Sequence, residues 1–375
     1  MAILFKRTDK LLTFACVVLS LFSILLLYSI SAMKFQYIRS DSYLIQIVAF
    51  AVGVLIAFIV SFFDYRRFSK LWFIYLPIAI ILVALTYTAM GVTVNGQRAW
   101  LNIKNTITFQ PSEVLKIAFI LSFSYHLSLL GKKNMNKLSN FILLCLHALV
   151  PILLVVLQSD DGTALVFVFI TILMMIFAGL SWKYILSGLV VLPAAAMLIW
   201  SKVLTSYQKD RFLIILDLNK DPDGLGYQQL ASRSSIFSAG LFGKGLFTHN
   251  YTYVAEIDND FIFSFVAQAL GFIGCITVCL VYIFILIRIL KTGFNCHNVL
   301  GKNICVGIFA MFAFHIVLNI AMNFGYAPVV GLPLPFLSSG GTYLITSYLA
   351  LGIVLSICSH SGKSYKSKNS RRGAR

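Results

Sequence analysis

The chain has 375 residues and a formal net charge of +17, from 30 Lys and Arg against 13 Asp and Glu. Only 11% of its residues are charged and 59% are hydrophobic, and the mean hydropathy is +0.89. A soluble globular chain carries about 25% charged residues. These values exclude a soluble domain and predict an integral membrane protein.

Ten apolar runs are each long enough to cross a bilayer as a helix of about 20 residues. They lie at about 11–33, 43–63, 71–90, 112–131, 139–157, 163–181, 184–201, 260–290, 303–326 and 341–359. The first run is longer than a signal-peptide core of roughly 7 to 15 residues, so we expect it to be a retained helix. We therefore predict an all-α polytopic membrane protein with ten transmembrane helices, built as one domain over 1–359 with a basic tail at 360–375.

Basic residues orient the predicted helices. They flank the first helix, follow the second and fourth, and fill the tail: Lys6, Arg7, Lys10, Arg66, Arg67, Lys70, Lys132, Lys133, Lys137, Lys363, Lys366, Lys368, Arg371, Arg372 and Arg375. Because basic loops stay on the cytoplasmic side, both termini are predicted to be cytoplasmic. The long connection between helices 7 and 8, about 202–259, then lies outside. The positive charge faces anionic lipids, and no nucleic-acid partner is expected.

Acidic residues gather on the opposite side. Ten of the thirteen lie on the predicted outer side, counting Asp260 at the start of its helix, and Glu113 lies just inside it. ATP and nucleotide sugars are not available there, and the chain has no G-x-x-x-x-G-K-[ST] phosphate loop. We therefore predict no nucleotide cofactor, and an enzyme at this face needs a substrate that is already activated.

Asp260 is the first candidate among these acids. It precedes a long apolar segment that carries no charge until Arg288. An acid at the start of a membrane helix is costly unless it has a function or a partner. The structural alternative is a helix N-cap, and both roles could coexist. Glu256 and Asp258 are interpreted as charges at the rim.

Glu113 and Lys116 begin the fourth predicted helix, directly after Pro111. Glu113 could simply complement the helix dipole. Lys116 lies one turn deeper on the same face, spaced i to i+3. A lysine entering a membrane helix needs a partner, so we predict a Glu113–Lys116 pair that faces the bundle interior, with Lys116 able to meet an anionic ligand.

Cations also occur in the predicted outer connections. Arg211 and Lys244 would suit a phosphate or pyrophosphate group, and Gly243 to Gly245 has the composition of an anion-cradling turn. Arg98, close to Trp100, could instead be part of an interfacial anchor. Asp160 lies in a tight turn between the fifth and sixth helices, where a polar residue would be ordinary.

The ninth predicted helix carries His315, Asn319 and Asn323 at four-residue spacing, which places them on one face. We expect interhelical hydrogen bonds from them. The apolar segment 328–342 that follows is rich in Pro and Gly and unlike a helix. Such a backbone is tolerated at membrane depth where it is buried in protein or lines a cavity, which predicts a re-entrant loop beside a central cavity.

Several motifs in fixed order resemble the SEDS proteins (shape, elongation, division, sporulation). They are Gln110-Pro111-Ser112-Glu113, Gly162-Thr163, Gly243-Lys244-Gly245, Asp260-Phe261-Ile262-Phe263, Val330-Gly331-Leu332-Pro333-Leu334-Pro335 and Ser339-Gly340-Gly341. The resemblance runs from about residue 90 to the last helix. Within the family, the segment from Val330 to Pro333 resembles the RodA members of cell elongation more than the FtsW members of division.

The resemblance implies a peptidoglycan glycosyltransferase that polymerises lipid II outside the bacterial cytoplasmic membrane. It implies a class B penicillin-binding protein and the elongation machinery as partners. The essential aspartate of the family falls on Asp260, which we expect to act as general base. The conserved Glu and Lys of the fourth helix fall on Glu113 and Lys116.

Lys116 and Arg211, with Arg98 or Lys244 as further candidates, would stabilise the departing pyrophosphate, and a divalent cation, Mg or Mn, could assist them. Gln110 and Asp160 complete the expected substrate-binding set. The chain departs from the family pattern at Asp258 and Asn259, where His-Thr is common, and at Gln268, Ser339 and the neighbours of Asp160. A lipid II flippase, and less so a secondary transporter, remain as alternatives.

Overall fold

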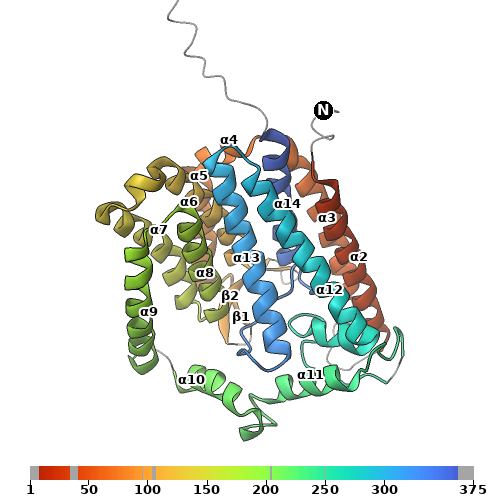
Figure 1. Ribbon diagram of the computed structural model, residues 1–375. Helices are drawn as coiled ribbons and strands as arrows, with labels where there is room; N and C mark the ends of the chain where they lie inside the picture. Colours follow the sequence, from red (N-terminus) through yellow and green to blue (C-terminus); the bar gives the residue numbers. More distant parts are fainter. Residues whose placement is uncertain are drawn as a thin grey trace, which may run out of the picture.

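The computed structural model describes residues 8–33, 41–94, 96–103, 107–202, 205–248 and 250–361. A helix lies in each of the ten apolar ranges, and together these helices form one bundle (Figure 1). They are α2 (Lys10–Ala32), α3 (Ser42–Phe62), α5 (Trp72–Ala84), α6 (Pro111–Met135), α7 (Leu138–Leu157), α8 (Asp161–Ala178), α9 (Trp182–Lys202), α12 (Ile262–Phe294), α13 (Val299–Asn323) and α14 (Gly341–His360).

Eight of these helices are long and apolar enough to cross a membrane. The other two, α5 with its 3-10 extension η1 (Leu85–Tyr87) and the first part of α9, are shorter apolar segments. The structure therefore confirms a mostly helical, multi-pass membrane protein. That all ten segments cross the bilayer stays a prediction.

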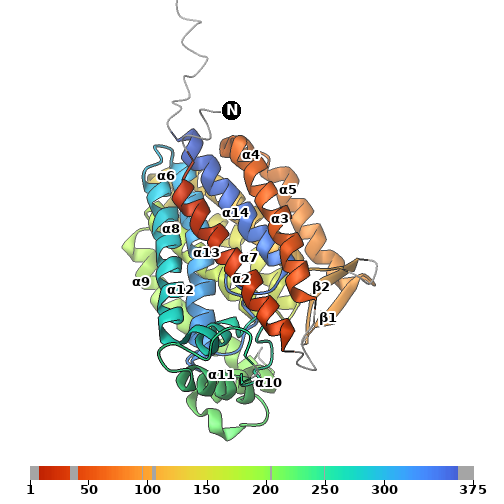
Figure 2. The ribbon, with the colours of Figure 1, turned by 90° about the vertical axis from the view of Figure 1, so that its right-hand side faces the viewer.

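The two ends of the bundle differ in what they carry. The short helix α4 (Tyr65–Lys70) lies at the end where α2 begins and α14 ends (Figures 1 and 2). The opposite end carries α10 (Ser206–Leu213), α11 (Tyr227–Ser238) and a small sheet. Which end is cytoplasmic stays a prediction. Lys6, Arg7 and residues 362–375 of the basic tail lie outside the described residues.

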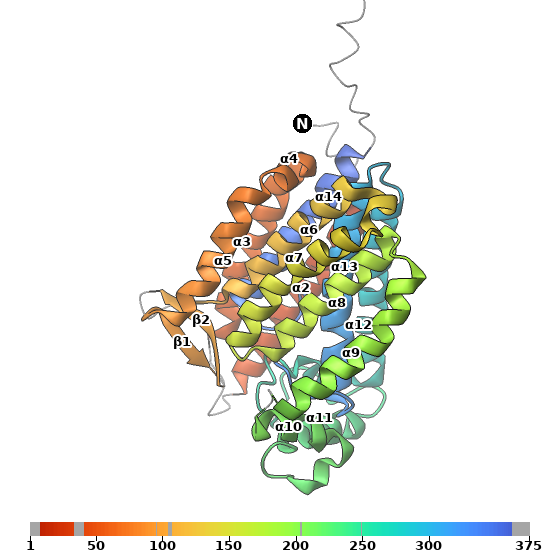
Figure 3. The same ribbon diagram turned by 90° about the vertical axis from the view of Figure 1, so that its left-hand side faces the viewer.

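Close helix packing depends on small residues, as is usual in membranes. α14 packs along α3, and a methyl group on Gly352 would come within 2.8 Å of the Ala57 Cα. α13 packs against α6, α8 and α12 and has one of the most buried surfaces in the bundle. α9 runs along the outer edge (Figure 3). The residues of the candidate site are held mainly by α12, α13 and the segment between α13 and α14.

The connection between η1 and α6 contains a three-stranded antiparallel sheet that the sequence analysis did not predict. Its strands are β1 (Gly91–Val94), β2 (Gln97–Ile103) and β3 (Ile107–Phe109), in the order β1-β2-β3. The fold is thus mostly, rather than wholly, helical.

The large predicted outer loop is also structured. It contains α10, two 3-10 turns, η2 (Ile214–Leu216) and η3 (Leu218–Lys220), and α11. α11 docks on the end of α13, because Gln229 Nε2 donates to the Ala327 carbonyl at 2.6 Å and Ser232 Oγ donates to the Asn323 carbonyl at 2.9 Å. This loop therefore covers the end of the bundle where the candidate site lies.

Candidate active site

Asp260 lies in a tight turn that leads into α12. The turn begins at Glu256, whose φ of 57° is unusual for a residue with a side chain. The Glu256 carbonyl accepts the N–H groups of Asn259 at 3.1 Å and Phe261 at 3.0 Å. Ile257 and Phe261 are fully buried and anchor the turn in the core.

Three consecutive carbonyl groups of this turn accept hydrogen bonds from other elements. The Asp258 carbonyl accepts the Ser339 N–H at 2.9 Å, and the Asn259 carbonyl accepts the Ser338 hydroxyl at 2.7 Å. The Asp260 carbonyl accepts Asn319 Nδ2 at 2.8 Å. The backbone that carries Asp260 is therefore fixed between α13 and the segment before α14.

That segment, 324–340, is non-helical and mostly buried, as predicted for a re-entrant loop. Several helices satisfy its carbonyl groups, as a buried irregular backbone requires. Ser23 Oγ donates to the Leu337 carbonyl at 2.5 Å, Gln46 Nε2 to that of Ser338 at 3.0 Å, and Tyr282 Oη to that of Pro335 at 2.9 Å. The loop is held rigidly beside the Asp260 turn.

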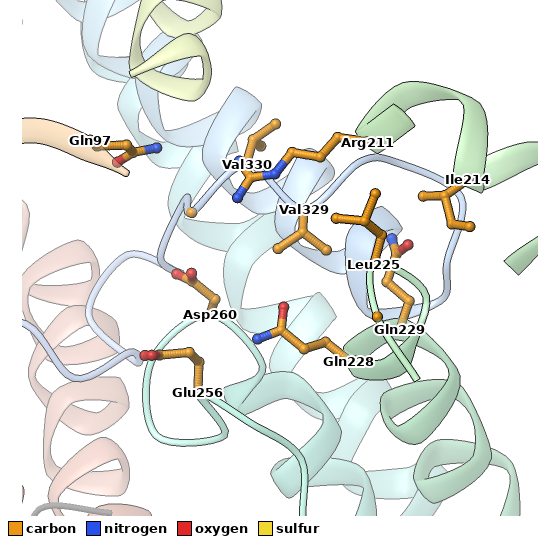
Figure 4. Close-up of a pocket in the computed structure, with 12 residues that line it drawn as sticks. Gln97, Arg211, Ile214, Leu225, Gln228, Gln229, Glu256, Asp260, Val329 and Val330 are labelled. Atoms are coloured by element: carbon orange, nitrogen blue, oxygen red, sulfur yellow. The ribbon is translucent and has the colours of Figure 1, made fainter. Parts of the chain in front are cut away.

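A cavity of about 320 Å³ opens at this place. Figure 4 shows Asp260 and Glu256 on one side of it, Arg211 on another, and the Gln228 side chain directed between them. The wall also includes Gln97, Ile214, Gly224, Leu225, Gln229, Val329, Val330 and Gly331. Asp260 is 9% exposed, and its Oδ1 atom is buried without a hydrogen-bond partner among the described residues.

The surroundings of Asp260 are acidic. Burial, followed by the charges of Glu256, Asp258 and Asp160, raises the pKa of Asp260 to about 7. Burial and the charge of Asp258 also raise the pKa of Glu256. A carboxyl group with a pKa near neutrality is suited to proton transfer.

The alternative role of Asp260 as a helix cap is wrong. α12 begins at Ile262, and its N-cap residue, Phe261, makes no side-chain capping hydrogen bond. Instead, the Ser264 N–H donates to Asn323 Oδ1 of α13 at 3.1 Å. The neighbouring helix supplies the cap, so the carboxylate of Asp260 is not needed for it.

The predicted Glu113–Lys116 pair is confirmed. Lys116 Nζ lies 2.8 Å from Glu113 Oε1 and 3.0 Å from His315 Nε2, and it lies 5.6 Å from the centre of the Tyr343 ring. His315 Nδ1 lies 3.1 Å from the Pro333 carbonyl and can only donate there, so Nε2 accepts from the ammonium group. This buried network supports the re-entrant loop and is not part of the cavity wall.

Gln110 and Asp160 form a second, partly buried pair. Asp160 Oδ1 accepts the Thr163 N–H at 3.0 Å and caps α8, and Asp160 Oδ2 accepts Gln110 Nε2 at 3.0 Å. Burial raises the pKa of Asp160 despite the hydrogen bonds to Thr163. Asp160 is near enough to contribute to the raised pKa of Asp260.

Arg98 and Lys244 do not line the cavity. The Arg98 guanidinium donates to the Thr86 carbonyl at 3.0 Å and to those of Tyr87 and Thr88 at 3.2 Å. It therefore ties the sheet to the end of η1. Lys244 Nζ donates to the Asn250 carbonyl at 2.6 Å. Of the cations predicted to bind pyrophosphate, Arg211 is the one that lines the cavity.

The interpretation of Gly243 to Gly245 as an anion-cradling turn is wrong. The N–H groups of Lys244 and Gly245 donate to the carbonyls of Gln268 and Ala269, at 2.7 and 3.0 Å. They fill a break in α12 at Gly271, where φ is 67°. The N–H groups are thus used within the fold and are not available to an anion.

The glutamine side chains of the wall were missed by the sequence analysis. Gln97, Gln228 and Gln229 are uncharged and lie in connections or in a short helix, so composition and spacing carry no signal for them. Gln229 is fully buried, and its Oε1 atom has no partner among the described residues.

The family that comprises FtsW, RodA and SpoVE, described as "Cell cycle protein", matches residues 9–363. The chain belongs to this family. It is 31% identical over 313 residues to the peptidoglycan glycosyltransferase MrdB of Escherichia coli K12, which covers 83% of this chain and 84% of the relative. It is 30% identical to the stage V sporulation protein E of Bacillus subtilis, with 95% and 99% covered.

Solved structures support the same assignment. A chain from a peptidoglycan synthase complex, solved in a study of the coordination of polymerization and crosslinking, superposes with a TM-score of 0.81 at 27% identity, covering 95% of this chain and 99% of that one. The rod shape determining protein RodA of Thermus thermophilus superposes with a TM-score of 0.70 at 26% identity, covering 95% and 98%. The resemblance to the SEDS family is therefore confirmed.

Two departures from the family pattern have visible structural roles. Gln268 holds the extended chain before the turn, because its Oε1 accepts the Thr252 N–H at 2.7 Å and its Nε2 donates to the Thr252 carbonyl at 3.2 Å. Asp258 Oδ2 accepts the Ser42 hydroxyl at 3.2 Å, which ties the turn to the start of α3.

Proposed function

We propose that the chain is a peptidoglycan glycosyltransferase that polymerises lipid II at the outer face of the bacterial cytoplasmic membrane during cell elongation. The observation that carries this proposal is the Asp260 carboxylate, which is fixed through its backbone at the wall of a cavity and whose Oδ1 has no partner within the described part of the chain. Membership of a family whose relatives are named peptidoglycan glycosyltransferases supports it.

In this mechanism Asp260 is the general base. It removes the proton from the GlcNAc 4-hydroxyl of one substrate as that oxygen attacks the anomeric carbon of the donor MurNAc. The bond from that carbon to undecaprenyl pyrophosphate breaks, and the pyrophosphate leaves with its electron pair. The donor carries its own activation, so no nucleotide is required.

The leaving group needs a cation, and Arg211 is in the right place. It lies in the same cavity wall as Asp260 and extends toward the open space (Figure 4). A guanidinium can bind two phosphate oxygens at once. Lys116 is buried below the re-entrant loop, so we propose that it supports the loop, together with Glu113 and His315.

A divalent cation remains a proposal. Among the described residues, His, Cys, Asp and Glu form no group of three that could hold a metal ion. Glu256 and Asp260 offer two carboxylates at the wall. Mg²⁺ is commonly bound by one or two carboxylates together with substrate phosphates, so the pyrophosphate would have to complete such a site.

We further propose a class B penicillin-binding protein as partner, in the setting of the elongation machinery. The similarity to a chain from a peptidoglycan synthase complex that couples polymerization and crosslinking supports this.

The decisive test is polymerisation of labelled lipid II by purified protein, with and without the partner. We expect Asp260→Asn to lose about 10²- to 10⁴-fold in rate, since that is the usual contribution of a general base. Asp223→Asn, an exposed outer-loop residue, is the matched control. Polymerisation by Asp260→Asn at the wild-type rate would rule out the base. Lipid II translocation without a glycan product, unchanged in Asp260→Asn, would favour the flippase.

A second pair of variants tests the cation. Arg211→Gln should raise the KM for lipid II and lower kcat, because a group that meets the pyrophosphate in the cavity is lost. Lys244→Gln should leave both constants near wild type, since Lys244 is bonded to the Asn250 carbonyl outside the cavity wall. Equal effects of the two substitutions would contradict the assignment of Arg211.

A further inference from the structure

Two asparagines on one face of α13 meet the backbone of Asp260. Asn319 and Asn323 are one turn apart and almost completely buried, at 1% and 0% exposure. Their Nδ2 atoms lie 2.8 and 3.2 Å from the Asp260 carbonyl oxygen. Two amide donors from a neighbouring helix therefore converge on one backbone oxygen.

Each amide also binds a second element. Asn319 Nδ2 donates to the Leu332 carbonyl of the re-entrant loop at 2.7 Å. Asn323 Oδ1 accepts the Ser264 N–H in the first turn of α12 at 3.1 Å. The pair thus fixes the Asp260 turn relative to the loop on one side and relative to α12 on the other.

The asparagine pair is linked to the outer loop through Ser232 of α11. Its hydroxyl donates to the Asn323 carbonyl at 2.9 Å and lies 3.3 Å from Asn323 Oδ1. Ser232 is fully buried. A displacement of α11 would therefore act on the residue that holds the Asp260 carbonyl.

The carboxylate itself is not held in this way. Asp260 Oδ1 has no hydrogen-bond partner among the described residues, so its location depends on the backbone behind it. A misplacement of about 1 Å can cost about 100-fold in rate when a catalytic group must meet a reacting atom.

We infer that Asn319 and Asn323 are positioning residues for Asp260, and that Ser232 couples the outer-loop helix α11 to them. This inference rests on the proposed role of Asp260 as general base.

The test compares three buried asparagines of the same helix, each changed to the similarly sized leucine. Asn319→Leu and Asn323→Leu should lower kcat for lipid II polymerisation about 100-fold while KM stays within about twofold, because binding is kept and only the alignment of the base is lost. Asn303→Leu is the control. Asn303 is 2% exposed, and its Nδ2 has no partner among the described residues. Ser232→Ala should lower kcat by about 3- to 10-fold, because one neutral hydrogen bond is removed.

Asn323→Asp tests whether a loss of rate comes from misplacement of Asp260 or from misfolding of the protein. It keeps the shape and the acceptor for the Ser264 N–H but removes the Nδ2 group that donates to the Asp260 carbonyl and to Asn319. We expect the same loss of kcat, measured on the alkaline plateau of the rate and below the thermal midpoint of the variant in detergent, because the new buried carboxylate lowers that midpoint and disfavours ionisation of Asp260. This variant decides the question even if a leucine variant does not fold.

Wild-type kcat in Asn323→Asp, or a parallel change of kcat and KM that follows a loss of thermal stability, would overturn the inference. Failure of the proposed function would be a different result, in which wild-type protein with its partner makes no glycan product.

Discussion

The charges that act on the pKa of Asp260 are those of acids. Glu256 and Asp258 share its turn, and Asp160 lies at the start of α8. Like charges and burial both disfavour the ionised form. The carboxylate thus becomes a stronger proton acceptor, and it ionises close to neutral pH.

This arrangement predicts a particular dependence of rate on pH. Burial and neighbouring acids raise the pKa of Asp260 to about 7. A general base acts when deprotonated, so the rate should rise as the pH increases through about 7. Asp258→Asn removes one repelling charge, lowers the pKa of Asp260 and moves the rising limb to lower pH. The measurement is kcat/KM for lipid II from pH 5 to 9.

The same profile of Asp223→Asn serves as the comparison, because that exposed residue does not contribute to the pKa of Asp260. A rising limb that stays in place, or moves to higher pH, in Asp258→Asn would contradict this account.

Site residues related by local spacing could be predicted from the sequence. Glu113 and Lys116 pair because i and i+3 positions share a helix face, and His315, Asn319 and Asn323 face one direction for the same reason. The residues that they contact on other elements could not be predicted. Lys116 meets His315, and Asn319 meets Asp260, through tertiary contacts between distant parts of the chain.

At the scale of elements, the break in α12 is the feature that could not be predicted from the sequence. Residues 240–245 form backbone hydrogen bonds with residues 268–273 on either side of Gly271. A helix break frees backbone groups that must be satisfied in a membrane protein, and this turn satisfies them. The sequence alone favours a ligand site at the short glycine turn, because its true partner, Gly271, lies in a different element.

Gly243→Ala tests this packing. An added Cβ would lie 2.5 Å from the Gly271 nitrogen and 2.6 Å from the Ala269 carbonyl group, at a φ of +74°. We expect the free energy of unfolding to fall by about 1 to 3 kcal/mol from overpacking, in addition to the cost of backbone strain, seen as a lower thermal midpoint in detergent.

Gly245→Ala is the matched control for backbone strain alone. Its φ is +84°, but the added Cβ would meet the Thr248 Cγ2 no closer than 3.8 Å. It should lower the free energy of unfolding by about 1 to 2 kcal/mol, the usual cost of a left-handed backbone for a residue with a side chain. Equal losses in the two variants would show that the contact with Gly271 does not matter.

At the scale of the whole molecule, hydropathy located every long helix of the bundle within a few residues. Length and apolar composition decide which segments can enter a membrane, and this is a property of the sequence. The sheet was missed because its strands are short and mixed in polarity. They are held by pairing with one another and by Arg98 at the end of η1.

The orientation of the bundle can be measured with introduced cysteines. Asp223 and Lys133 are both exposed and lie in the connection between α9 and α12 and at the end of α6, respectively. If the basic side is cytoplasmic, an impermeant maleimide added to intact cells should label Asp223→Cys and not Lys133→Cys. Permeabilised cells should label both, and the parent chain gives the background. The reverse pattern would invert the proposed topology.

The size of the cavity has a consequence for turnover. At about 320 Å³ it is at the lower end of the range of about 300 to 1,000 Å³ found for sites that hold one small ligand. Glycan synthesis requires a donor and an acceptor sugar side by side. If both sugars enter this cavity, its wall must move outward to admit them. One part of the wall is formed by Arg211, Leu225 and Gln228 of the long connection. Because this part lies outside the packed bundle, it can move more easily than the rest of the wall. Polymerisation speed would then depend on how often this wall opens as well as on the chemistry at Asp260.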